Sequence, residues 1–456
     1  MESVIERYLD EVCSYIKFKE VHEEVKEELR CHIQEFVEEL VDRGIEEEEA
    51  VKKVIKSMGS SDLVGERLNK VHKDKIDWIS LIIISFLSIL GVVSIYFISL
   101  SHVTRDEPVV HAMSYMRVNI FYSCLGIILL GIFYIWDIRK LKKYSFLIFF
   151  GVIVLFGCVM VNRNTMNGRL VLSLGSNISI SLYPLVFLFI LSSCGILDIV
   201  DWEKRRNLWY GFLITIVPVV ILMICKSTSL TFVYLTIILT LIFRSNIRTI
   251  DKIIILLGSL IPVFVFLGSS EYFINSMLKQ IDYMNNIDDY GFIRYRIHYL
   301  LKDVKMFGNG FHIQGLPLPV MESSFIMVYI IISLGWVGFG FVVSMIGVLF
   351  FRIINKIGLY NNRYLKNISL AFFLLLFIQA LLHILGSLNL IPTTFHGLMP
   401  FVSYGRTNIL LSFTAFGFIL SSYRRRNLKL ESRENKLGVF KNKLPYLEVK
   451  LRWRNK

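Results

Sequence analysis

The chain has 456 residues, of which 54% are hydrophobic, and its formal net charge is +13 at pH 7. A soluble protein of this length could not bury so much apolar surface, so the composition excludes a soluble globular protein. The positive charge lies mostly in short segments between apolar runs, where it is typical of a membrane topology signal. We therefore do not expect a nucleic acid partner.

Residues 1–75 are expected to form a small cytoplasmic helical domain, and they hold 20 acidic against 13 basic residues. Their apolar residues recur at intervals of three and four, the pattern of an amphipathic helix: Val21, Val25, Leu29, Ile33, Phe36 and Leu40. Gly44 is suited to end this helix. A second helix begins with glutamates, continues with lysines and is expected to end at Gly59.

The segment from residue 76 to residue 423 is expected to be an all-α, polytopic membrane domain. It contains successive apolar runs, each long enough to cross a hydrocarbon core about 30 Å thick as a helix. We expect ten spans, at about 78–100, 117–136, 145–161, 181–197, 211–225, 229–243, 253–269, 323–350, 366–390 and 405–423. Residues 424–456 then form a basic cytoplasmic tail.

Basic residues alternate with the spans and indicate an orientation. The connections at 137–144, 201–207, 244–252 and 352–366 are rich in lysine and arginine, and so is the tail. Positive charge marks the cytoplasmic side, so we expect both termini in the cytoplasm and an even number of spans. The longest outer loop then covers about residues 270–322.

This outer loop is expected to carry a helix at the membrane surface. Between residues 292 and 305, aromatic and aliphatic residues interleave with basic ones. Arg294, Arg296 and Lys302 are suited to contact a lipid diphosphate. The polar step Glu322–Ser324 follows at the outer entrance of the eighth span, where a membrane enzyme would meet a lipid head group.

The sequence predicts no metal site formed by protein side chains alone. The six cysteines are scattered, and no pair has metal-ligand or redox spacing. No cofactor is expected with certainty, although a divalent cation could accompany a lipid diphosphate. His383, within the ninth span, is more typical of a satisfied buried histidine than of a ligand.

Two segments carry a resemblance to a known family. One contains Gly308 and Gly310, then Leu318 and Pro319, and ends with Leu334-Gly335 and Gly338. The other, "IPTTFHGLMPFVSYG", supplies Pro392, Thr394, Gly397, Pro400, Phe401, Ser403, Tyr404 and Gly405. These segments resemble the FtsW/RodA/SpoVE family, which acts in bacterial shape, elongation, division and sporulation. Separately, residues 27–68 resemble a small helical prefix found ahead of some bacterial permeases, which implies a cytoplasmic partner.

The resemblance implies a function and a location. Members of the family polymerise glycan strands from undecaprenyl-linked peptidoglycan precursor (lipid II), usually with a partner transpeptidase, a penicillin-binding protein. The chain would then lie in the bacterial cytoplasmic membrane and handle that lipid at the outer leaflet.

The chain departs from the family at positions that carry chemistry. Ser324 takes the place of the key aspartate, and Glu322 takes that of a histidine. Glycosyl transfer needs a base or a group that organises the leaving pyrophosphate, which a serine hydroxyl alone supplies poorly. On a helix, Glu322 and Ser324 would be about 200° apart and point to opposite faces. Both remain catalytic candidates.

Three further cations are candidates for the lipid diphosphate. Lys226 stands in the turn where the family has an acid, Arg406 replaces a glycine after Tyr404-Gly405, and Arg169 lies in an outer loop where the family also has arginine. Several functions stay open: a diverged glycan polymerase, a non-catalytic lipid-binding or scaffold relative regulated through the prefix, and a flippase or transporter. An O-antigen-polymerase-like protein would not predict the "MPFVSYG" ending.

Overall fold

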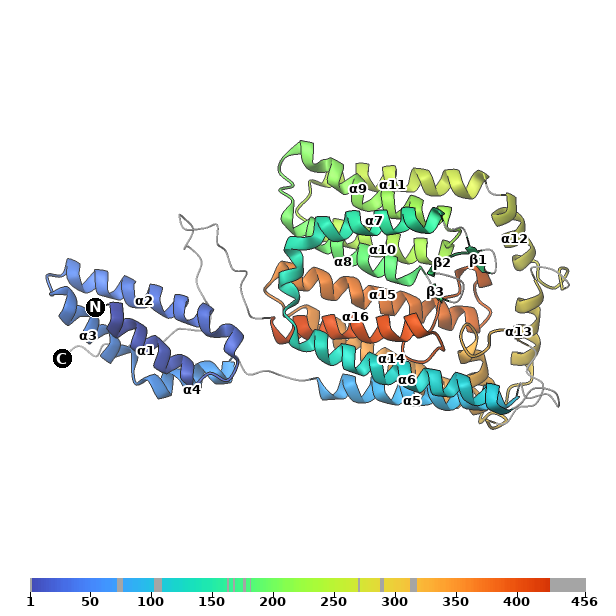
Figure 1. Ribbon diagram of the computed structural model, residues 1–456, viewed down its shortest axis with the longest axis horizontal. Helices are drawn as coiled ribbons and strands as arrows, with labels where there is room; N and C mark the ends of the chain where they lie inside the picture. Colours follow the sequence, from blue (N-terminus) through green and yellow to red (C-terminus); the bar gives the residue numbers. More distant parts are fainter. Residues whose placement is uncertain are drawn as a thin grey trace.

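The computed structural model describes residues 2–71, 77–101, 109–161, 164–166, 169–174, 178–180, 182–269, 271–287, 291–311 and 318–426 (Figure 1). Most of the predicted tail, residues 427–456, lies outside the described residues. The described chain separates into an N-terminal group of four helices and a larger group of long apolar helices.

The N-terminal group, here called the prefix domain, has a core of its own. It contains α1 (Glu2–Ser14), η1 (Lys19–Val21), α2 (His22–Asp42), α3 (Glu47–Met58) and α4 (Ser61–Val71). Val25, Leu29 and Ile33 of α2 are buried in this core as the spacing predicted, but Val37 is buried there in place of Phe36, which is 47% exposed. Gly44 and Gly59 follow the ends of α2 and α3 with positive φ angles, as expected for helix-ending glycines.

Ten apolar helices form the second group, and each corresponds to one predicted span. They are α5 (Trp78–Ser101), α6 (Val109–Ile135), α7 (Ser145–Val161), α8 (Tyr183–Ile199), α9 (Leu208–Ile224), α10 (Thr228–Arg244), α11 (Thr249–Ser269), α14 (Ile326–Ile357), α15 (Arg363–Ser387) and α16 (Arg406–Arg424). Within the described residues, six candidate spans are long and apolar enough to cross a membrane. The prediction of an all-α polytopic membrane protein is confirmed.

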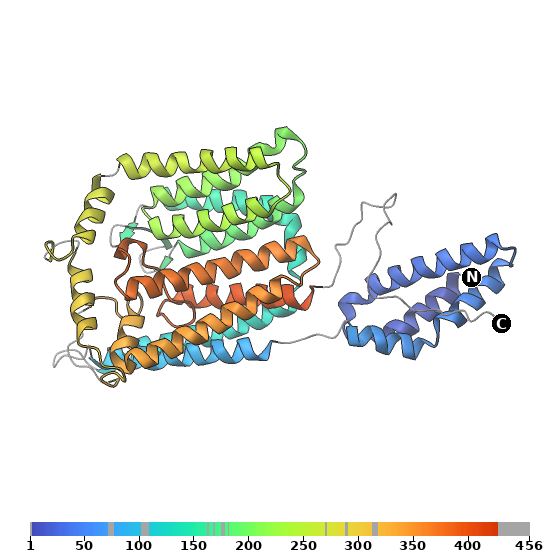
Figure 2. The ribbon, with the colours of Figure 1, turned by 180° about the vertical axis from the view of Figure 1, so that it is seen from behind.

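The ten helices run side by side between two ends of the domain (Figures 1 and 2). We call the end to which the prefix domain is joined the domain end. It carries η2 (Ile138–Tyr144) and η3 (Arg205–Asn207). The loop end is opposite and carries α12 (Glu271–Ile281), α13 (Phe292–Lys302) and η4 (Thr393–Phe395). It also carries a small antiparallel sheet that was not predicted: β1 (Asn164–Met166), β2 (Arg169–Leu174) and β3 (Ile178–Ile180).

Ion pairs tie helices together at the domain end. Asp77, just before α5, is nearly buried and pairs with Arg352 at 2.8 Å and with Lys356, both near the end of α14. Lys142 of η2 pairs with Asp198 of α8 at 2.5 Å. Arg425, just after α16, also lies at this end, 3.7 Å from Asp137. The start of the first membrane helix and the end of the last one are therefore on the same side, as an even number of spans requires.

Helix α14 is broken at Gly335, and the break is filled by a loop from the chain before it. Gly335 has φ +72° and ψ −175°, which ends the helical hydrogen-bond pattern there. Three backbone hydrogen bonds of 3.0–3.1 Å replace the missing helical ones: Asn309 N to Ile332 O, Gly310 N to Ser333 O and Val337 N to Met306 O. Non-helical backbone is tolerated among apolar helices only when its polar groups are satisfied in this way.

The break explains the glycines of the first motif and gives a test. Gly308 and Gly335 touch backbone to backbone: a Cβ on either would lie 2.3 Å from the other segment's main chain. Gly335→Ala would also hold alanine at φ +72° and ψ −175°, a backbone region essentially restricted to glycine, which costs on the order of 1–3 kcal/mol before any clash. We expect a clear fall in the apparent melting temperature of the purified protein, measured by intrinsic fluorescence.

Gly340→Ala in the same helix is the matched control. Its added methyl group meets no atom within 4 Å. Since alanine favours a helix over glycine by roughly 0.5–1 kcal/mol, this variant should be neutral or slightly more stable. Equal melting temperatures for the two variants would contradict the role assigned to Gly335.

Candidate functional site

Two turns that are about 80 residues apart in sequence meet at the loop end. The turn before α14 contains Glu322 and Ser323, and the turn before α16 contains Ser403 and Tyr404. The Tyr404 N–H donates to the Glu322 carbonyl at 2.9 Å, and the Ser403 hydroxyl donates to the Ser323 carbonyl at 2.7 Å. The two sequence motifs are therefore parts of one site.

Ser403 holds this junction from inside the protein. Its side chain is fully buried, and its oxygen also accepts a hydrogen bond of 2.9 Å from the Met399 N–H. Asn408, in the first turn of α16, donates to the Met399 carbonyl at 3.3 Å. Because one hydroxyl serves two main-chain groups, the position of the turn before α14 depends on the fold of the turn before α16.

Glu322 and Ser324 do not lie on a helix. We expected the eighth span to begin near residue 323, but α14 begins at Ile326, and Pro319–Phe325 form turns. Helical rotation therefore does not relate the two side chains, and the prediction that they point to opposite helix faces is wrong. Among the described residues, the partly exposed Glu322 carboxylate has no hydrogen-bond or ion-pair partner, so it is available to a ligand. Its catalytic role, and that of Ser324, stay predictions.

Arg294 is buried and acts as a structural staple in this structure. It lies in α13 with 8% of its surface exposed, and its donors reach three acceptors: Asn389 Oδ1 at 2.8 Å, Asn389 O at 2.6 Å and Gln280 O at 2.7 Å. Burial lowers the pKa of the guanidinium, yet arginine remains charged near neutral pH. With these donors engaged, the geometry does not favour the diphosphate role expected for Arg294.

The segment that Arg294 holds, residues 389–396, joins several elements of the loop end. Gln280 of α12 exchanges hydrogen bonds with the hydroxyls of Thr393 and Thr394, at 2.9 and 3.0 Å. Thr228 of α10 donates to the Thr394 carbonyl at 3.3 Å. Gln280 and Asn389 gave no signal in the sequence, because polar residues in loops are common and their partners are distant in the chain.

Four of the other predicted cations are more exposed to solvent than Arg294. Arg296 of α13 is half-buried and stacks over the Phe292 ring at 5.3 Å, while Lys302 at the end of the same helix is exposed. Lys226 and Arg406 are exposed at the starts of α10 and α16, and none of these three exposed cations has an ion-pair partner among the described residues. The Arg169 backbone lies in β2, paired with Met166, and its side chain is outside the description.

The proline and glycine residues of the motifs shape the turns of the site. Pro319 precedes Val320, whose φ is +50°, and Pro400 precedes Phe401, whose φ is +65°. Pro392 precedes η4, and Gly405 is the N-cap of α16. Their roles as motif residues therefore concern backbone direction, with no side-chain chemistry required.

Two histidines lie behind the junction. The rings of His383 in α15 and His396 are 4.8 Å apart between centroids, and His396 also packs edge-on against Phe325 at 4.9 Å. His383 Nδ1 donates to the Gly397 carbonyl at 2.9 Å, but its Nε2 has no protein partner among the described residues, so it is only half satisfied. No group of three or more metal-ligating side chains occurs in the described part of the chain.

Residues 77–428 match the family profile for FtsW, RodA and SpoVE, described as cell cycle proteins. The chain belongs to this family. The match covers the ten apolar helices and both turns of the site, and it begins after the prefix domain. A search of curated proteins gives no match.

Solved structures show the same fold. One, from a study of how a peptidoglycan synthase complex coordinates polymerization and crosslinking, has a TM-score of 0.61 at 17% identity, covering 77% of this chain and 99% of that one. The rod shape determining protein RodA of Thermus thermophilus has a TM-score of 0.56 at 15% identity, covering 77% and 98%. An aspartate-to-alanine mutant of that RodA gives 0.55 at 16%, covering 77% and 99%.

The staple role of Arg294 can be tested by a conservative change. Arg294→Lys keeps the charge, but an ammonium group cannot reach three acceptors that a rigid planar fork serves. Loss of two charged hydrogen bonds should cost about 3–6 kcal/mol. We expect a lower apparent melting temperature and faster hydrogen exchange at residues 389–396.

Arg296→Lys, two residues further along α13, is the control. Arg296 is half-buried and stacks on the Phe292 ring of its own helix, so the change should stay within about 0.5 kcal/mol. If Arg294→Lys were as stable as the wild-type protein but bound a lipid diphosphate more weakly than the wild-type protein does, Arg294 would be a ligand-binding residue after all.

Proposed function

We propose that this FtsW/RodA/SpoVE family member binds the undecaprenyl-linked peptidoglycan precursor, lipid II, and acts as a diverged glycan-strand polymerase. The observation that carries the proposal is the junction of the two turns, which places a carboxylate with no protein partner among the described residues, Glu322, beside the Tyr404 turn. The family membership and the shared fold support the substrate class.

The orientation of the site follows from charge. The basic connections, including Arg139, Lys142, Arg352 and Lys356, lie at the domain end. Because positive charge is retained in the cytoplasm, the domain end faces the cytoplasm, both termini lie there, and the loop end opens at the outer leaflet of the bacterial cytoplasmic membrane. Lipid II is polymerised at that leaflet by the family.

The proposed chemistry uses the charged side chains of the site that are not buried. Lys226, Arg296, Lys302 and Arg406 supply cations for the precursor's diphosphate, alone or with a divalent cation. Glu322 takes the proton from the attacking sugar hydroxyl or organises the leaving diphosphate, the work that Ser324 cannot do as a neutral hydroxyl.

A second candidate is a non-catalytic relative that binds the precursor or a partner. Ser324 at the family's acidic position favours it, and the prefix domain would then connect the protein to a cytoplasmic partner. Under either function we propose a penicillin-binding transpeptidase as the membrane partner, since the protein of one similar structure belongs to a peptidoglycan synthase complex. A flippase or transporter is the third candidate.

The proposal is tested with purified protein in nanodiscs, fluorescent lipid II and divalent cation. Wild-type protein should form glycan chains, and Glu322→Ala should lower the rate by roughly 10²–10⁴-fold, the usual contribution of a general base. The fold should survive, because Glu322 holds the junction through its backbone carbonyl.

Asp303→Ala, an exposed acid just after α13, is the control and should polymerise at the wild-type rate. Binding of lipid II with no chains under any condition would favour the non-catalytic relative. Absence of both binding and polymerisation would refute the substrate class.

A further inference from the structure

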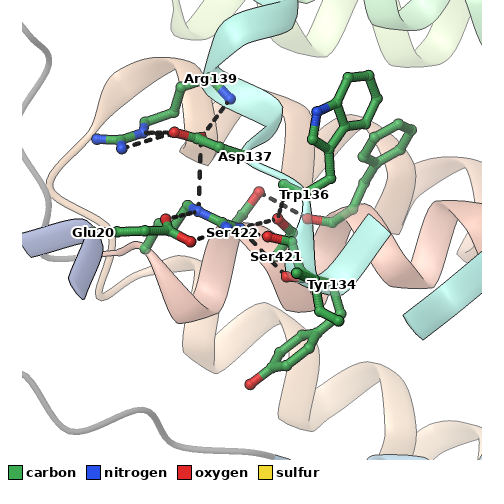
Figure 3. A network of polar contacts seen from close by, with 10 residues as sticks. Glu20, Tyr134, Trp136, Asp137, Arg139, Ser421 and Ser422 are labelled. Atoms are coloured by element: carbon green, nitrogen blue, oxygen red, sulfur yellow. Dashed lines mark hydrogen bonds and ion pairs between the residues drawn. The ribbon is translucent and has the colours of Figure 1, made fainter. Parts of the chain in front are cut away.

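A fully buried arginine lies at the domain end, just after the last residue of α16. The Arg425 side chain has no exposed surface. Its guanidinium donates to five acceptors: Glu20 Oε2 at 2.5 Å, Glu20 Oε1 at 2.6 Å, Ile135 O at 2.6 Å, Tyr134 O at 3.4 Å and Ser421 Oγ at 2.5 Å. Figure 3 shows Glu20 of the prefix domain facing this group of membrane-domain residues. We name this set of contacts the Arg425 clasp.

The clasp joins three separate parts of the chain. Glu20 belongs to η1 of the prefix domain, Tyr134 and Ile135 are the last residues of α6, and Arg425 follows α16. The two carbonyls are among those that a helix end leaves without intrahelical partners, so a cation is well placed there. Asp137, held by Arg139, adds a carboxylate oxygen 3.7 Å from Arg425 Nε.

The prefix side of the contact is small and charged. Besides Glu20, Phe18 lies under the Arg424 guanidinium at 5.1 Å. Burial acts to lower the pKa of Arg139, but the Asp137 carboxylate, helped by those of Glu20 and Glu24, raises it. The cores of the prefix domain and of the membrane domain form two separate clusters. A domain that has a core of its own, and no extensive helix packing onto its neighbour among the described elements, can leave its docking site without unfolding.

The clasp is connected to the opposite end of the molecule by a rigid pair of helices. α6 and α16 pack against each other more extensively than any other described pair of elements. Their backbones approach closely: a Cβ at Gly417 would lie 3.2 Å from the Leu130 carbonyl oxygen. The pair therefore has little freedom to shear, and displacement of one end is carried along its length.

At the loop end the same pair carries the site. α16 begins directly after the Tyr404 turn, and Tyr115 of α6 packs edge-on against the Tyr404 ring at 5.3 Å. Tyr404 in turn holds the Glu322 carbonyl. One pair of helices thus has the Arg425 clasp at one end and the two-turn junction at the other.

We propose that the prefix domain is a releasable regulatory module that controls the order of the two-turn junction through the α6–α16 pair, with the Arg425 clasp as its docking contact. When Glu20 is in place, the ends of α6 and α16 are locked together and the junction is ordered. When Glu20 leaves, Arg425 loses its two short carboxylate hydrogen bonds and keeps only the longer contact with Asp137. The ends of α6 and α16 then loosen, and the backbone amides of the Tyr404 turn exchange their hydrogens faster. The inference does not require that the site bind lipid II.

The test uses the full chain in nanodiscs. Spin labels on native Cys31, which is exposed in α2, and on Arg248→Cys at the domain end report the distance between the two parts, with Cys124 and Cys158 replaced. Hydrogen exchange of residues 399–405 reports the junction. Glu20→Gln should broaden the distance distribution and speed exchange of these amides by roughly two- to thirtyfold, the range of coupling carried by packed networks.

Glu23→Gln, an exposed acid in the first turn of α2, is the matched control and should change neither signal. Glu20→Asp keeps the charge but shortens the side chain, and it should give an intermediate effect if Glu20→Gln proves difficult to produce. An unchanged distance distribution in both Glu20 variants would overturn the docking contact. A changed distance with unchanged exchange at 399–405 would overturn the coupling to the site.

Discussion

Satisfaction of backbone hydrogen bonds among apolar helices is the constraint on which this structure depends. Where a helix stops or breaks inside the packed protein, its main-chain groups have no water to bond and must find partners within the chain. At the Gly335 break the partners are the backbone groups of residues 306–310. At the end of α6 and after α15 they are the side chains of Arg425 and Arg294. At both the loop end and the domain end, groups from other segments thus take the place of the missing helical hydrogen-bond partners.

The two buried arginines therefore have different roles in the structure. Arg294 ties α13 to α12 and to the segment after α15, so it fixes the frame in which the site lies. Arg425 ties the ends of α6 and α16 to the prefix domain, so it connects the site to a part of the chain outside the family match. Both are placed on carbonyls at or near helix ends, where a planar, permanently charged donor has the most acceptors within reach.

Glu322 lies in a different local structure from the one expected from the sequence. Glu322 was expected on the first turn of a helix, where its relation to Ser324 would be fixed by helical rotation. It lies instead in a turn that is held by Tyr404 and Ser403, so its backbone position is set by contacts with the last motif. Because the junction is made through the backbone carbonyls of residues 322 and 323, it does not depend on the side chain at position 322.

The sequence by itself determined the ten apolar helices, the helical prefix domain, the glycines that end its helices and the two motifs of the site. These follow from hydrophobic length, periodicity and residue type, which are local properties. Only the tertiary structure decided that Arg294 is a staple, that Gly308 meets Gly335, and that Glu20 reaches Arg425 across 405 positions of the chain. Such partners are chosen by packing between distant segments, and the order of residues along the chain carries no direct record of that choice.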